Sequence, residues 1–444
     1  MNQEYSCPIW LQDTKPNWAI QRIKYATYLK ARVGWHGLTS NEYLNKGVLL
    51  ITGTDFENGR INWKICYRVS EERYQQDPYI QIQEGDLLIT KDGTIGKVAL
   101  IQGLNEPATL NSGIFVTRPL KGTYSNHFMY WLLKSKVFQT FIDYIKVGTT
   151  INHLYQNQLS DFAFPVPSLE IQQAIASFLD RKTAAIDTLI AKKQRLIQLL
   201  EEKRTALINQ AVTQGLNPNV PMKNSGIAWI SKIPEHWEVS RLSFLSTTIQ
   251  TGPFGSQLHA SEYVENGIPL VNPINIQRGN IVADYQKTVN QEVAIRLSRH
   301  KLLIGDLVFA RRGELGRCGV INKNNNGWLC GTGCIQVRVS KIKVYPDYLN
   351  LFISIPWVAS WLSLESVGST MDNLNTEILS TLPIILPPKE EQIKIFQYIE
   401  LKKYLFDKLI TTIDRQISKL QEYRQSLITA AVTGKIDISE EVAA

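Results

Sequence analysis

Two glycine-rich segments are the first places in this sequence to test for chemistry. Asp92-Gly-Thr-Ile-Gly-Lys-Val98 has the lysine of a phosphate-binding loop, but it lacks that loop's first glycine and has valine where serine or threonine would bind magnesium. Gly313-Glu-Leu-Gly-Arg-Cys-Gly319 has a glycine-rich look, yet no long helix follows it as a dinucleotide loop requires. Each segment follows a predicted strand, so we interpret both as turns.

Side chains suited to metal or acid–base catalysis are present but do not gather. Glu201-Glu-Lys203 has the composition of a nuclease motif, but it lies in a predicted long helix, where a solvated charged face is expected. The six histidines are scattered, and Cys330 and Cys334 lack the spacing and histidine partners of a zinc site. Leu386-Pro-Pro-Lys389 does not match the Asn/Asp-Pro-Pro-aromatic tetrapeptide of DNA methyltransferases. We therefore predict no catalytic site and no metal site in this chain.

The elements that carry these turns occur twice, in a tandem duplication. Trp10 and Trp18 are eight residues apart, and Trp229 and Trp237 repeat that spacing 219 residues later. The later matches, at an offset of 220, are Gly85-Asp86 with Gly305-Asp306, Gly93-x-x-Gly96 with Gly313-x-x-Gly316, Gly148-Thr-Thr with Gly368-Ser-Thr, Glu170-x-Gln172 with Glu390-x-Gln392, and Arg204 to Thr213 with Arg424 to Thr433. The copies are too long for solenoid repeats and diverge between these anchors. The pattern indicates one architecture that carries two different surfaces.

Each copy is predicted to contain a globular α+β domain followed by a long helix. Strand-like runs such as 48–52 and 86–90 alternate with turns, and helices fit 128–144 and 348–364. Prolines precede both predicted long helices, as is typical of a helix start. The expected divisions are a first domain (1–165), a central helix (166–214), a linker (215–232), a second domain (233–385), a C-terminal helix (386–436) and a tail (437–444).

The two predicted long helices have apolar residues at heptad spacing. Two rows with a period of seven form the narrow seam that a coiled coil needs, although Lys193 interrupts one row and Arg204 and Arg424 end the other. The expected seam residues are Ile186, Ile190, Ile197, Leu200 and Leu207 in the first helix and Phe406, Ile410, Ile413, Ile417, Leu420 and Leu427 in the second. We expect an antiparallel coiled coil that separates the two domains; the alternative is a surface helix on each domain.

The composition is that of a globular protein with more than one domain. The chain has 444 residues, of which 44% are hydrophobic and 20% charged. The net charge of +8 favours a polyanionic partner without establishing one. The five cysteines are scattered, as expected for reduced thiols in the cytosol. Because the sequence has neither a signal-peptide pattern nor an apolar run of about 20 residues, we predict a cytoplasmic protein without a membrane span.

The duplicated motifs together resemble the specificity subunits of type I restriction–modification systems. The resemblance covers essentially the whole chain and is strongest in 225–237, which opens the second copy, and in 423–437. The first copy departs from the pattern in having Gln214 where the second has Gly434. The resemblance implies two target-recognition domains, each of which binds one half of an asymmetric, bipartite DNA site. It also implies that the long helices set the gap between the half-sites and dock two methylation subunits.

The same resemblance assigns the chemistry to partner proteins. Methylation subunits would use S-adenosylmethionine to methylate adenine, and restriction subunits would join them and use ATP and Mg²⁺. This chain would hold no cofactor and would have no catalytic activity of its own. Its partners would be double-stranded DNA and these subunits, with no membrane.

Basic, aromatic and polar residues near the repeated turns are the candidates for DNA contacts. Base recognition needs side chains on base edges, while Lys and Arg on phosphates set the register. The candidates are Lys30, Arg32, Trp35, His36, Lys91, Thr94, Thr149, Thr150 and Asn152 in the first domain and Gln250, Ser256, Gln257, Arg311, Arg312, Ser369, Thr370 and Asn373 in the second. Arg311 and Arg312 are favoured, because arginine suits both guanine edges and phosphates. Gly85-Asp86 and Gly305-Asp306 occur in both domains and are expected to form turns instead.

Two other functions stay open on the sequence alone. The chain could be the recognition portion of a fused methyltransferase–nuclease whose catalytic part lies elsewhere, which a methylation assay on the chain alone would test. It could also be a scaffold that uses its coiled coil for protein assembly and binds no DNA. Salt-sensitive DNA binding would separate that scaffold from a DNA-recognition protein, because phosphate contacts make affinity fall steeply with salt.

Overall fold

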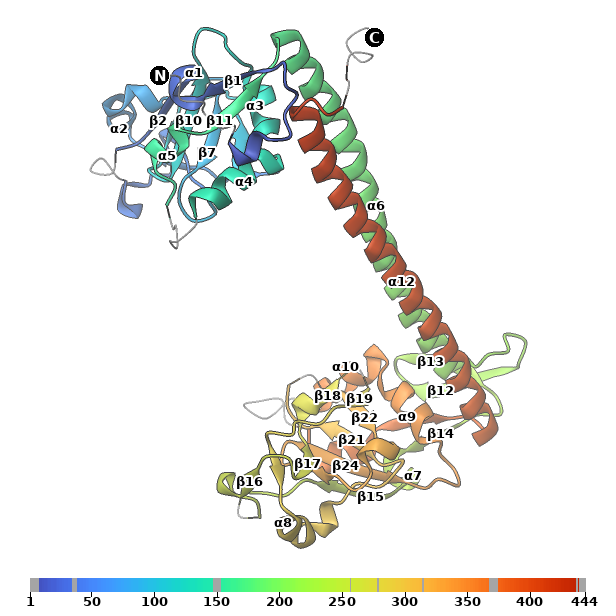
Figure 1. The fold of residues 1–444 in the computed structure, drawn as a ribbon. Helices are drawn as coiled ribbons and strands as arrows, with labels where there is room; N and C mark the ends of the chain where they lie inside the picture. The colour runs from blue at the N-terminus through green and yellow to red at the C-terminus, as the bar shows by residue number, and fades with distance from the viewer. Residues whose placement is uncertain are drawn as a thin grey trace. The chain divides into compact units, whose positions relative to one another are not determined.

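The computed structural model describes residues 8–33, 38–146, 153–255, 257–277, 279–313, 315–366, 374–436 and 438. The chain divides into two compact units, each with its own hydrophobic core. Unit 1 comprises Met1–Gln194 and Asp414–Ala444, and unit 2 comprises Arg195–Ile413. Both units mix helices with small sheets (Figure 1), so the predicted α+β fold is confirmed.

The strands described in unit 1 form a central sheet and several smaller ones. They are β1 (Ala19–Arg22), β2 (Thr27–Ala31), β3 (Val48–Ile51), β4 (Phe56–Glu57), β5 (Arg60–Ile61), β6 (Tyr67–Val69), β7 (Leu87–Thr90), β8 (Val98–Leu100), β9 (Ala108–Leu110), β10 (Ile114–Pro119) and β11 (Ala163–Val166). The central sheet is antiparallel with the order β2-β10-β7-β8. Beside it lie the sheet β6-β3-β9 and the pairs β1-β11 and β4-β5. The ends of β2 and β7 and the start of β10 therefore share one edge of the central sheet.

Short helices flank the sheets of unit 1. They are α1 (Ile23–Ala26), α2 (Glu71–Gln76), α3 (Asn126–Leu133), α4 (Lys136–Ile145) and α5 (Gln156–Ser160). The single helix predicted over 128–144 is wrong, because the chain breaks between α3 and α4. The hydroxyl of Ser135 donates to the carbonyl of Leu132 (2.6 Å) and accepts a hydrogen bond from the N–H of Val137 (3.1 Å). Ser135 thereby ends one helix and caps the next.

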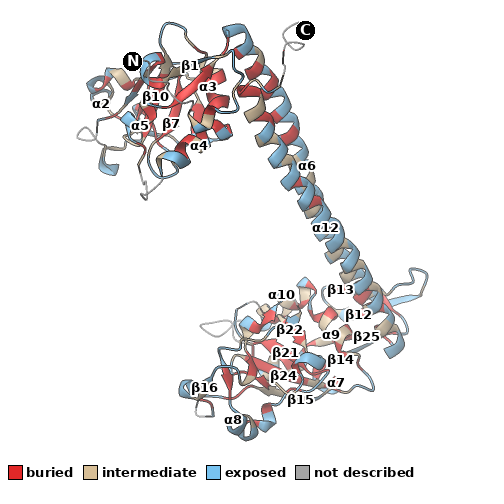
Figure 2. Ribbon diagram, viewed as in Figure 1, coloured by how far each residue is buried: buried red, intermediate tan, exposed pale blue. Residues whose placement is uncertain are grey.

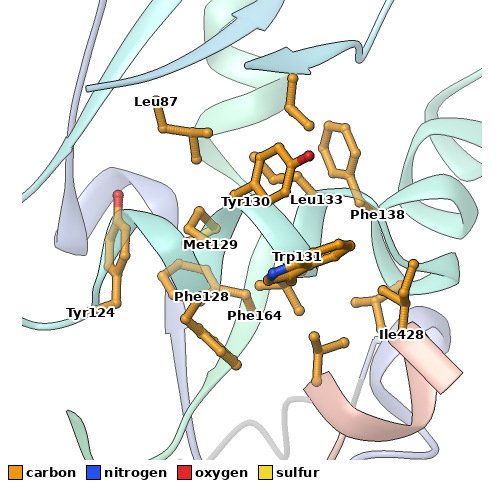
Figure 3. Packing of buried hydrophobic residues seen from close by; sticks show 14 of the residues in the cluster. Leu87, Tyr124, Phe128, Met129, Tyr130, Trp131, Leu133, Phe138, Phe164 and Ile428 are labelled. Carbon is orange, nitrogen blue, oxygen red and sulfur yellow. The ribbon is translucent and has the colours of Figure 1, made fainter. Parts of the chain in front are cut away.

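The central sheet of unit 1 is covered on both faces, which explains the continuous apolar run in β7. Leu87 and Ile89 belong to the core that includes α3 and α4, and Leu88 belongs to a second cluster on the opposite face. The first core is rich in aromatic side chains, and α3 contributes Phe128, Tyr130 and Trp131, of which Trp131 lies beside Tyr130 (Figure 3). A strand that is buried on both faces favours apolar residues at successive positions, and the predicted strand 86–90 has this pattern at 87–89.

Unit 2 repeats this plan. Its strands are β12 (Met222–Ile227), β13 (Ile230–Pro234), β14 (Glu238–Arg241), β15 (Ser246–Thr251), β16 (Tyr263–Val264), β17 (Ile268–Val271), β18 (Ile276–Gln277), β19 (Asn280–Ile281), β20 (Thr288–Val289), β21 (Leu307–Ala310), β22 (Cys318–Val320), β23 (Leu329–Cys330), β24 (Cys334–Val339) and β25 (Pro383–Leu386). The central sheet, β15-β24-β21-β22, has the same order as that of unit 1 and the same register except for a bulge between Ser246 and Thr248 in β15. The parallel pair β17-β23 corresponds to β3-β9.

The short helices of unit 2 show the same break as those of unit 1. They are α7 (Leu242–Leu245), α8 (Gln291–Arg296), α9 (Pro346–Ile353), α10 (Pro356–Glu365) and α11 (Thr376–Thr381). The helix predicted over 348–364 is therefore two helices, and Pro356 occupies the first position of the second one. As in unit 1, buried side chains concentrate in the central sheet and the helices that cover it (Figure 2).

Two long helices, α6 (Leu169–Gln214) and α12 (Lys389–Val432), pack on each other. Of the predicted seam, Ile186, Ile413, Ile417 and Leu427 are buried, and the other members are half-buried. The polar pairs that join the helices are Asp187–Arg424 (2.8 Å) and Lys193–Gln416 (2.7 Å) in unit 1 and Arg204–Asp407 (3.0 Å) in unit 2. Residue numbers rise along one helix as they fall along the other, which confirms the predicted antiparallel pairing. Lys193, which interrupts an apolar row, thus has a polar partner.

The repeated motif at the end of each long helix packs into a domain core. Ile428, Ala431 and Val432 of α12 are buried in the core of unit 1. Figure 3 shows Ile428 among the side chains of this core. Ala211 and Val212 of α6 are buried in the core of unit 2. Each helix end thus completes one core, which accounts for the shared Ala-Val-Thr sequence.

A glycine with positive φ follows each long helix. Gly215 has a φ of 79° and Gly434 a φ of 73°, the left-handed conformation that commonly ends a helix. A Cβ on Gly434 would lie 2.8 Å from Trp18, and one on Gly215 would lie 3.1 Å from Trp237. Gly215, one residue beyond Gln214, therefore takes the place of Gly434, and the first copy does not depart from the second here.

Several predicted boundaries are corrected by the structure. The long helices begin at Leu169 and Lys389 rather than at 166 and 386, because β11 and β25 occupy the preceding residues and pair with β1 and β14. The second helix ends at Val432 rather than at 436. The predicted linker 215–232 is only partly a linker, since β12 and β13 form an antiparallel hairpin within unit 2.

Two repeated sequence anchors have equivalent structural roles in the two units. The carboxylate of Asp86 accepts the N–H of Gln83 (2.8 Å) and pairs with Arg118 (2.7 Å). Asp306 does the same with the N–H of Leu303 (2.8 Å) and with Arg338 (2.7 Å). Both aspartates are buried. The prediction that these Gly-Asp pairs form turns is confirmed.

The glutamine of the Glu-x-Gln motif joins each long helix to its domain. Gln172 accepts the N–H of Ser125, which precedes α3, at 2.8 Å and donates to the carbonyl of Pro167 at 2.8 Å. Gln392 accepts the N–H of Tyr345, which precedes α9, at 2.8 Å and donates to the carbonyl of Pro387 at 2.8 Å. Both side chains are fully buried. The motif therefore fixes the angle at which the helix leaves the domain.

Candidate nucleic-acid interface

One edge of the central sheet of unit 1 gathers several of the predicted contact segments. The loop edge of unit 1 is defined here as residues 91–97, 111–113 and 153–155. The N–H of Lys91 donates to the carbonyl of Gly113 (2.8 Å), and the N–H of Leu154 donates to the carbonyl of Lys91 (2.8 Å). The side chain of His153 also contacts that of Asp92. Segments far apart in the sequence therefore meet at the end of β7.

Unit 2 has an equivalent edge, composed of residues 252–255, 257, 311–313, 315–317, 331–333 and 374. The N–H of Arg311 donates to the carbonyl of Gly333 (2.9 Å), and the N–H of Leu374 donates to the carbonyl of Arg311 (2.9 Å). These two bonds are those of Lys91, shifted by 220 residues. Gly252 lies against Gly331 so closely that a Cβ would stand 1.9 Å from its carbonyl oxygen. Only glycine fits at 252, so this turn cannot vary there.

The first residue of the repeated turn is a half-buried cation in both units. Lys91 lies 5.4 Å from the ring of Phe115, and Arg311 lies 5.4 Å from the ring of Phe254. Burial lowers the pKa of Lys91, and burial together with the neighbouring Arg312 lowers the pKa of Arg311. Each cation is therefore partly desolvated, which strengthens its attraction to an incoming anion.

The second residue of the turn differs in charge between the units. Asp92 in unit 1 and Arg312 in unit 2 stand at the same position, 220 residues apart, and both are exposed. Asp92 pairs with His153, whereas no ion pair of Arg312 exists among the described residues. At the same backbone position, unit 1 thus presents the carboxylate of Asp92, which accepts hydrogen bonds, and unit 2 presents the guanidinium of Arg312, which donates them.

The predicted contacts in unit 1 divide into exposed and internal residues. Lys30 is exposed on β2, one residue before the strand ends, with its ammonium 5.9 Å from the ring of Tyr28. Thr94 is exposed in the turn, and its carbonyl accepts the hydroxyl of Thr90. Lys91 and Thr94 therefore lie together at the loop edge, as the repeat suggests.

Arg32 was predicted as a DNA contact, but the structure places it in the interior rather than on the surface. Its side chain is fully buried in an ion pair with Asp77. Its Nε donates to the carbonyl of Leu110 (2.8 Å), and a terminal nitrogen donates to Thr109 (3.1 Å). Burial lowers the pKa of this guanidinium, and Asp77 opposes the shift. Arg32 therefore joins β2 to neighbouring segments and leaves the set of candidate DNA contacts.

The predicted contacts in unit 2 divide in the same way. Gln250 uses its amide internally, donating to the carbonyl of Arg299 (3.3 Å) and meeting the ring of the buried His300 (2.9 Å). Gln257 accepts the N–H of Phe254 (3.0 Å) and closes the turn that follows β15. The Nε of Arg311 donates to the carbonyl of Leu374 (3.2 Å), so its guanidinium links two segments of this loop edge. Arg312 is the exposed basic residue of this set.

The remaining candidates fall outside the described residues. They are Trp35, His36, Thr149, Thr150 and Asn152 in unit 1 and Ser256, Ser369, Thr370 and Asn373 in unit 2. Their neighbours in sequence, His153 and Leu374, lie at the loop edges described above.

Sequence reasoning missed two residues at the loop edges. Phe254 is 52% exposed, which is unusual for phenylalanine, and it carries the Arg311 guanidinium on its ring. Its position between Pro253 and Gly255, in a turn, was the available signal. Asp92 was missed because acidic residues do not fit phosphate binding, although a carboxylate can accept a hydrogen bond from a base.

The cysteines that could suggest a metal site lie in apolar surroundings. Cys318, Cys330 and Cys334 are buried in the strands of unit 2, and burial raises the pKa of each thiol. No group of three or more potential metal ligands occurs among the residues that the structure describes. In the same described part of the chain, no helix combines the length and apolar composition that a membrane span requires.

A duplicated scaffold with unlike side chains on equivalent edges defines a protein that presents two different binding surfaces on one frame. The family model of the type I restriction modification DNA specificity domain matches residues 37–199 and 234–420. The chain therefore belongs to this family and is a DNA specificity subunit of a type I restriction–modification system.

Relatives of known function support this assignment across most of the chain. The EcoBI specificity subunit of Escherichia coli is 24% identical over 377 residues, which cover 80% of this chain and 76% of the relative. The EcoKI specificity subunit of Escherichia coli (strain K12) is 23% identical over 432 residues, which cover 94% and 89%.

Solved structures share the fold. A chain from a study of complex assembly and conformational transition of the type I R-M system has a TM-score of 0.67 and 17% identity, covering 95% of this chain and 99% of that one. The HsdS subunit from Thermoanaerobacter tengcongensis has a TM-score of 0.57 and 16% identity, covering 95% and 98%.

Proposed function

We propose that each unit binds one half of an asymmetric, bipartite DNA sequence through its loop edge. The observation that carries this proposal is the exchange of Asp92 for Arg312 within identical backbone hydrogen bonds. A shared frame with unlike donors and acceptors is what recognition of two different half-sites requires.

The chemistry of the two positions indicates which bases they suit. The fork of Arg312 can donate two hydrogen bonds to the major-groove edge of guanine, and each good bidentate pair contributes about 1–3 kcal/mol of discrimination. The carboxylate of Asp92 can accept from the amino group of cytosine. Lys91 and Arg311, partly buried behind them, suit phosphate contacts that fix the register. The exposed Phe254 offers an apolar face to a thymine methyl or a sugar.

We further propose that the chain has no catalytic activity and works with partner subunits in the cytoplasm. Two methylation subunits would supply S-adenosylmethionine chemistry on adenine, and restriction subunits would supply the ATP- and Mg²⁺-dependent steps. The proposal is supported by the names of the relatives, which are specificity subunits, and by the type I complex whose assembly one structural neighbour illustrates. A methylation assay on the chain alone tests it, and methyl transfer without a partner would contradict it.

The decisive experiment maps adenine methylation in cells that express this chain with the methylation subunit from its own operon. We expect one bipartite motif. Arg311→Ala with Arg312→Ala should abolish methylation at that motif, since unit 2 loses its cationic edge. Arg241→Ala, which removes an exposed arginine from β14 of the same unit, is the matched control and should leave the motif intact.

The alternatives give different outcomes in the same experiment. If the two proteins co-purify but no motif is methylated, the scaffold function stands and DNA recognition fails. If the double arginine variant methylates the unchanged motif as well as the wild type, unit 2 does not recognise DNA through this edge.

A further inference from the structure

A groove on unit 1 holds lysines from separate segments of the chain. It lies between the repeated turn, the β4–β5 turn and the start of α4, and Gln425 of α12 borders it. Among its lining residues are Lys97, Lys134 and Lys136, and none of the residues that line it is acidic. We call it the lysine groove. The charged residues that line the groove are all positive. The groove adjoins the loop edge of unit 1, because Lys97 is the last residue of the turn that begins at Lys91.

The fold itself brings the lysines together. Lys97 follows Gly96, whose φ of 81° turns the chain so that a Cβ there would lie 3.3 Å from Phe138 of α4. Lys134 and Lys136 flank Ser135, the residue that breaks α3 from α4. The N–H of Lys136 donates to the hydroxyl of Thr429 on α12 at 3.1 Å. The groove is therefore supported by the domain and by the long helix of the same unit.

The lysines have no carboxylate partner that would neutralise them inside the groove. Lys97 and Lys136 are exposed and form no ion pair among the described residues. The ammonium of Lys134 donates to the hydroxyl of Tyr130 (2.8 Å) and lies 4.8 Å from its ring. Burial, and then the charge of Arg424, lower the pKa of Lys134 to about 8, against a weaker opposing effect of Asp187. An anion in the groove would stabilise the charged form of Lys134 and oppose this shift.

Unit 2 has a pocket at the equivalent place, and its lining is of mixed charge. Ser354 and Pro356 stand where unit 1 has Lys134 and Lys136, but Arg317 stands where unit 1 has Lys97. Asp347, Glu400 and Lys403 also line the pocket. Burial raises the pKa of Asp347, and Glu400 adds to that shift. The cation at the position of Lys97 is thus shared by both units, whereas the two lysines that flank Ser135 are particular to unit 1.

We propose that the lysine groove binds phosphates of the DNA backbone next to the half-site that unit 1 recognises. The proposal rests on the proposed function, since it takes DNA to lie on the loop edge of unit 1. A duplex on residues 91–97 would bring its backbone to Lys97 at the mouth of the groove. Lysine contacts phosphate as a point charge and carries no sequence information. The groove therefore adds affinity that is equal for all sequences.

The test measures how DNA affinity of the full chain depends on salt, with a duplex of unrelated sequence as the probe. Each phosphate contact contributes about 0.9 to the slope of log affinity against log salt. Lys97→Gln with Lys136→Gln should therefore make this negative slope shallower by about 2 and weaken binding about tenfold at low salt. The control, Lys46→Gln with Lys64→Gln, removes two exposed lysines of unit 1 that do not line the groove. It should leave the slope nearly unchanged.

The outcomes separate this proposal from the proposed function. Wild-type chain that shows no salt-dependent DNA binding contradicts both. Wild-type binding with an unchanged slope in the groove variant, or with an equal loss in the control, overturns the groove alone. Loss of co-purification with the methylation subunit, with the DNA slope intact, would assign the groove to an acidic protein surface and also overturn it. Thermal unfolding of both double variants shows whether the fold is kept.

Discussion

The loop edges of the two units share their backbone and differ in their side chains. Lys91 and Arg311 make the same two main-chain hydrogen bonds and both lie over an aromatic ring. One residue later, unit 1 has Asp92 and unit 2 has Arg312. The two copies thus keep the main-chain hydrogen bonds of the turn and the half-buried cation at its first position. The exposed residue at the next position differs in charge between them.

The interior differs between the units behind these edges. Unit 1 buries the Arg32–Asp77 ion pair just after β2, whereas unit 2 ends β15 with Thr251 and follows it with Gly252. In unit 2, Gln250 and the buried His300 meet near this place, and burial lowers the pKa of His300. The two units thus stabilise equivalent edges with different polar interiors.

The largest expected effect comes from breaking the buried pair of unit 1. Arg32→Met leaves the carboxylate of Asp77 buried without its guanidinium partner, which we expect to destabilise unit 1 by about 3–5 kcal/mol. Denaturant unfolding of the full chain measures the change. Lys30→Met, an exposed change on β2 two residues earlier, is the control and should have little effect. Equal stability of the two variants would show that the pair is not structural.

The second prediction concerns pH and again applies to unit 1 alone. The pKa of Lys134 is about 8 in the folded chain and 10.5 in its ordinary state. Between these values the unfolded chain holds a proton that the folded chain lacks, so the free energy of unfolding should rise with pH across this window. Below pH 8 both states are protonated, and the penalty of burying the charge is at its full value, about 3 kcal/mol at most.

Lys134→Met should remove that rise and stabilise the chain at pH 7. The charged neighbours Arg424 and Asp187, and the hydroxyl of Tyr130, remain in the variant. Unfolding measured from pH 7 to 10 gives the result, and Lys136→Met, which is exposed, is the control. A rise of the same size in wild type and Lys134→Met would assign the pH dependence to other groups.

The third prediction compares matched residues in the two units. Gln172→Ala and Gln392→Ala each remove a buried amide that joins a long helix to a domain, and each takes the partner from a main-chain N–H and from the carbonyl of a buried proline. Gln392→Ala also removes a hydrogen bond to the carbonyl of Lys343. We expect losses of about 1–3 kcal/mol from each, and similar losses from both. A loss confined to one variant would show that the two joints are not equivalent, although the two glutamines share two equivalent hydrogen bonds.

Much of the scaffold was predictable because the duplication repeats structural residues. Gly85-Asp86 and the heptads of the long helices recur for reasons of geometry, and their predicted roles were confirmed. The break at Ser135 was missed, because a serine within an apolar helical pattern looks like a tolerated helix residue until its hydroxyl is placed. The β-hairpin of 222–234 was missed because the prolines and glycines around it indicated a linker.

The candidate site was harder to predict, since single side chains have no repeated pattern behind them. Arg32 appeared in a basic, aromatic, glycine-bearing stretch, and nothing in the sequence placed Asp77, 45 residues away, against it. Arg311 and Arg312 look alike in sequence, yet only the structure separates the half-buried anchor from the exposed residue. The equivalence of Asp92 and Arg312 was present in the offset of 220 but gains meaning only from the shared hydrogen bonds.

The smallest effect is expected from changing the charge at the equivalent positions of Asp92 and Arg312. Asp92→Asn removes the one negative charge of the turn while keeping a polar side chain next to His153. Repulsion of phosphates should fall, so affinity for unrelated duplex at low salt should rise about two- to fivefold, which is below 1 kcal/mol for an exposed charge. Arg312→Gln makes the matched change in unit 2 and should lower the same affinity by a similar factor. If both variants shift affinity in the same direction, the charge exchange at this position does not act on DNA.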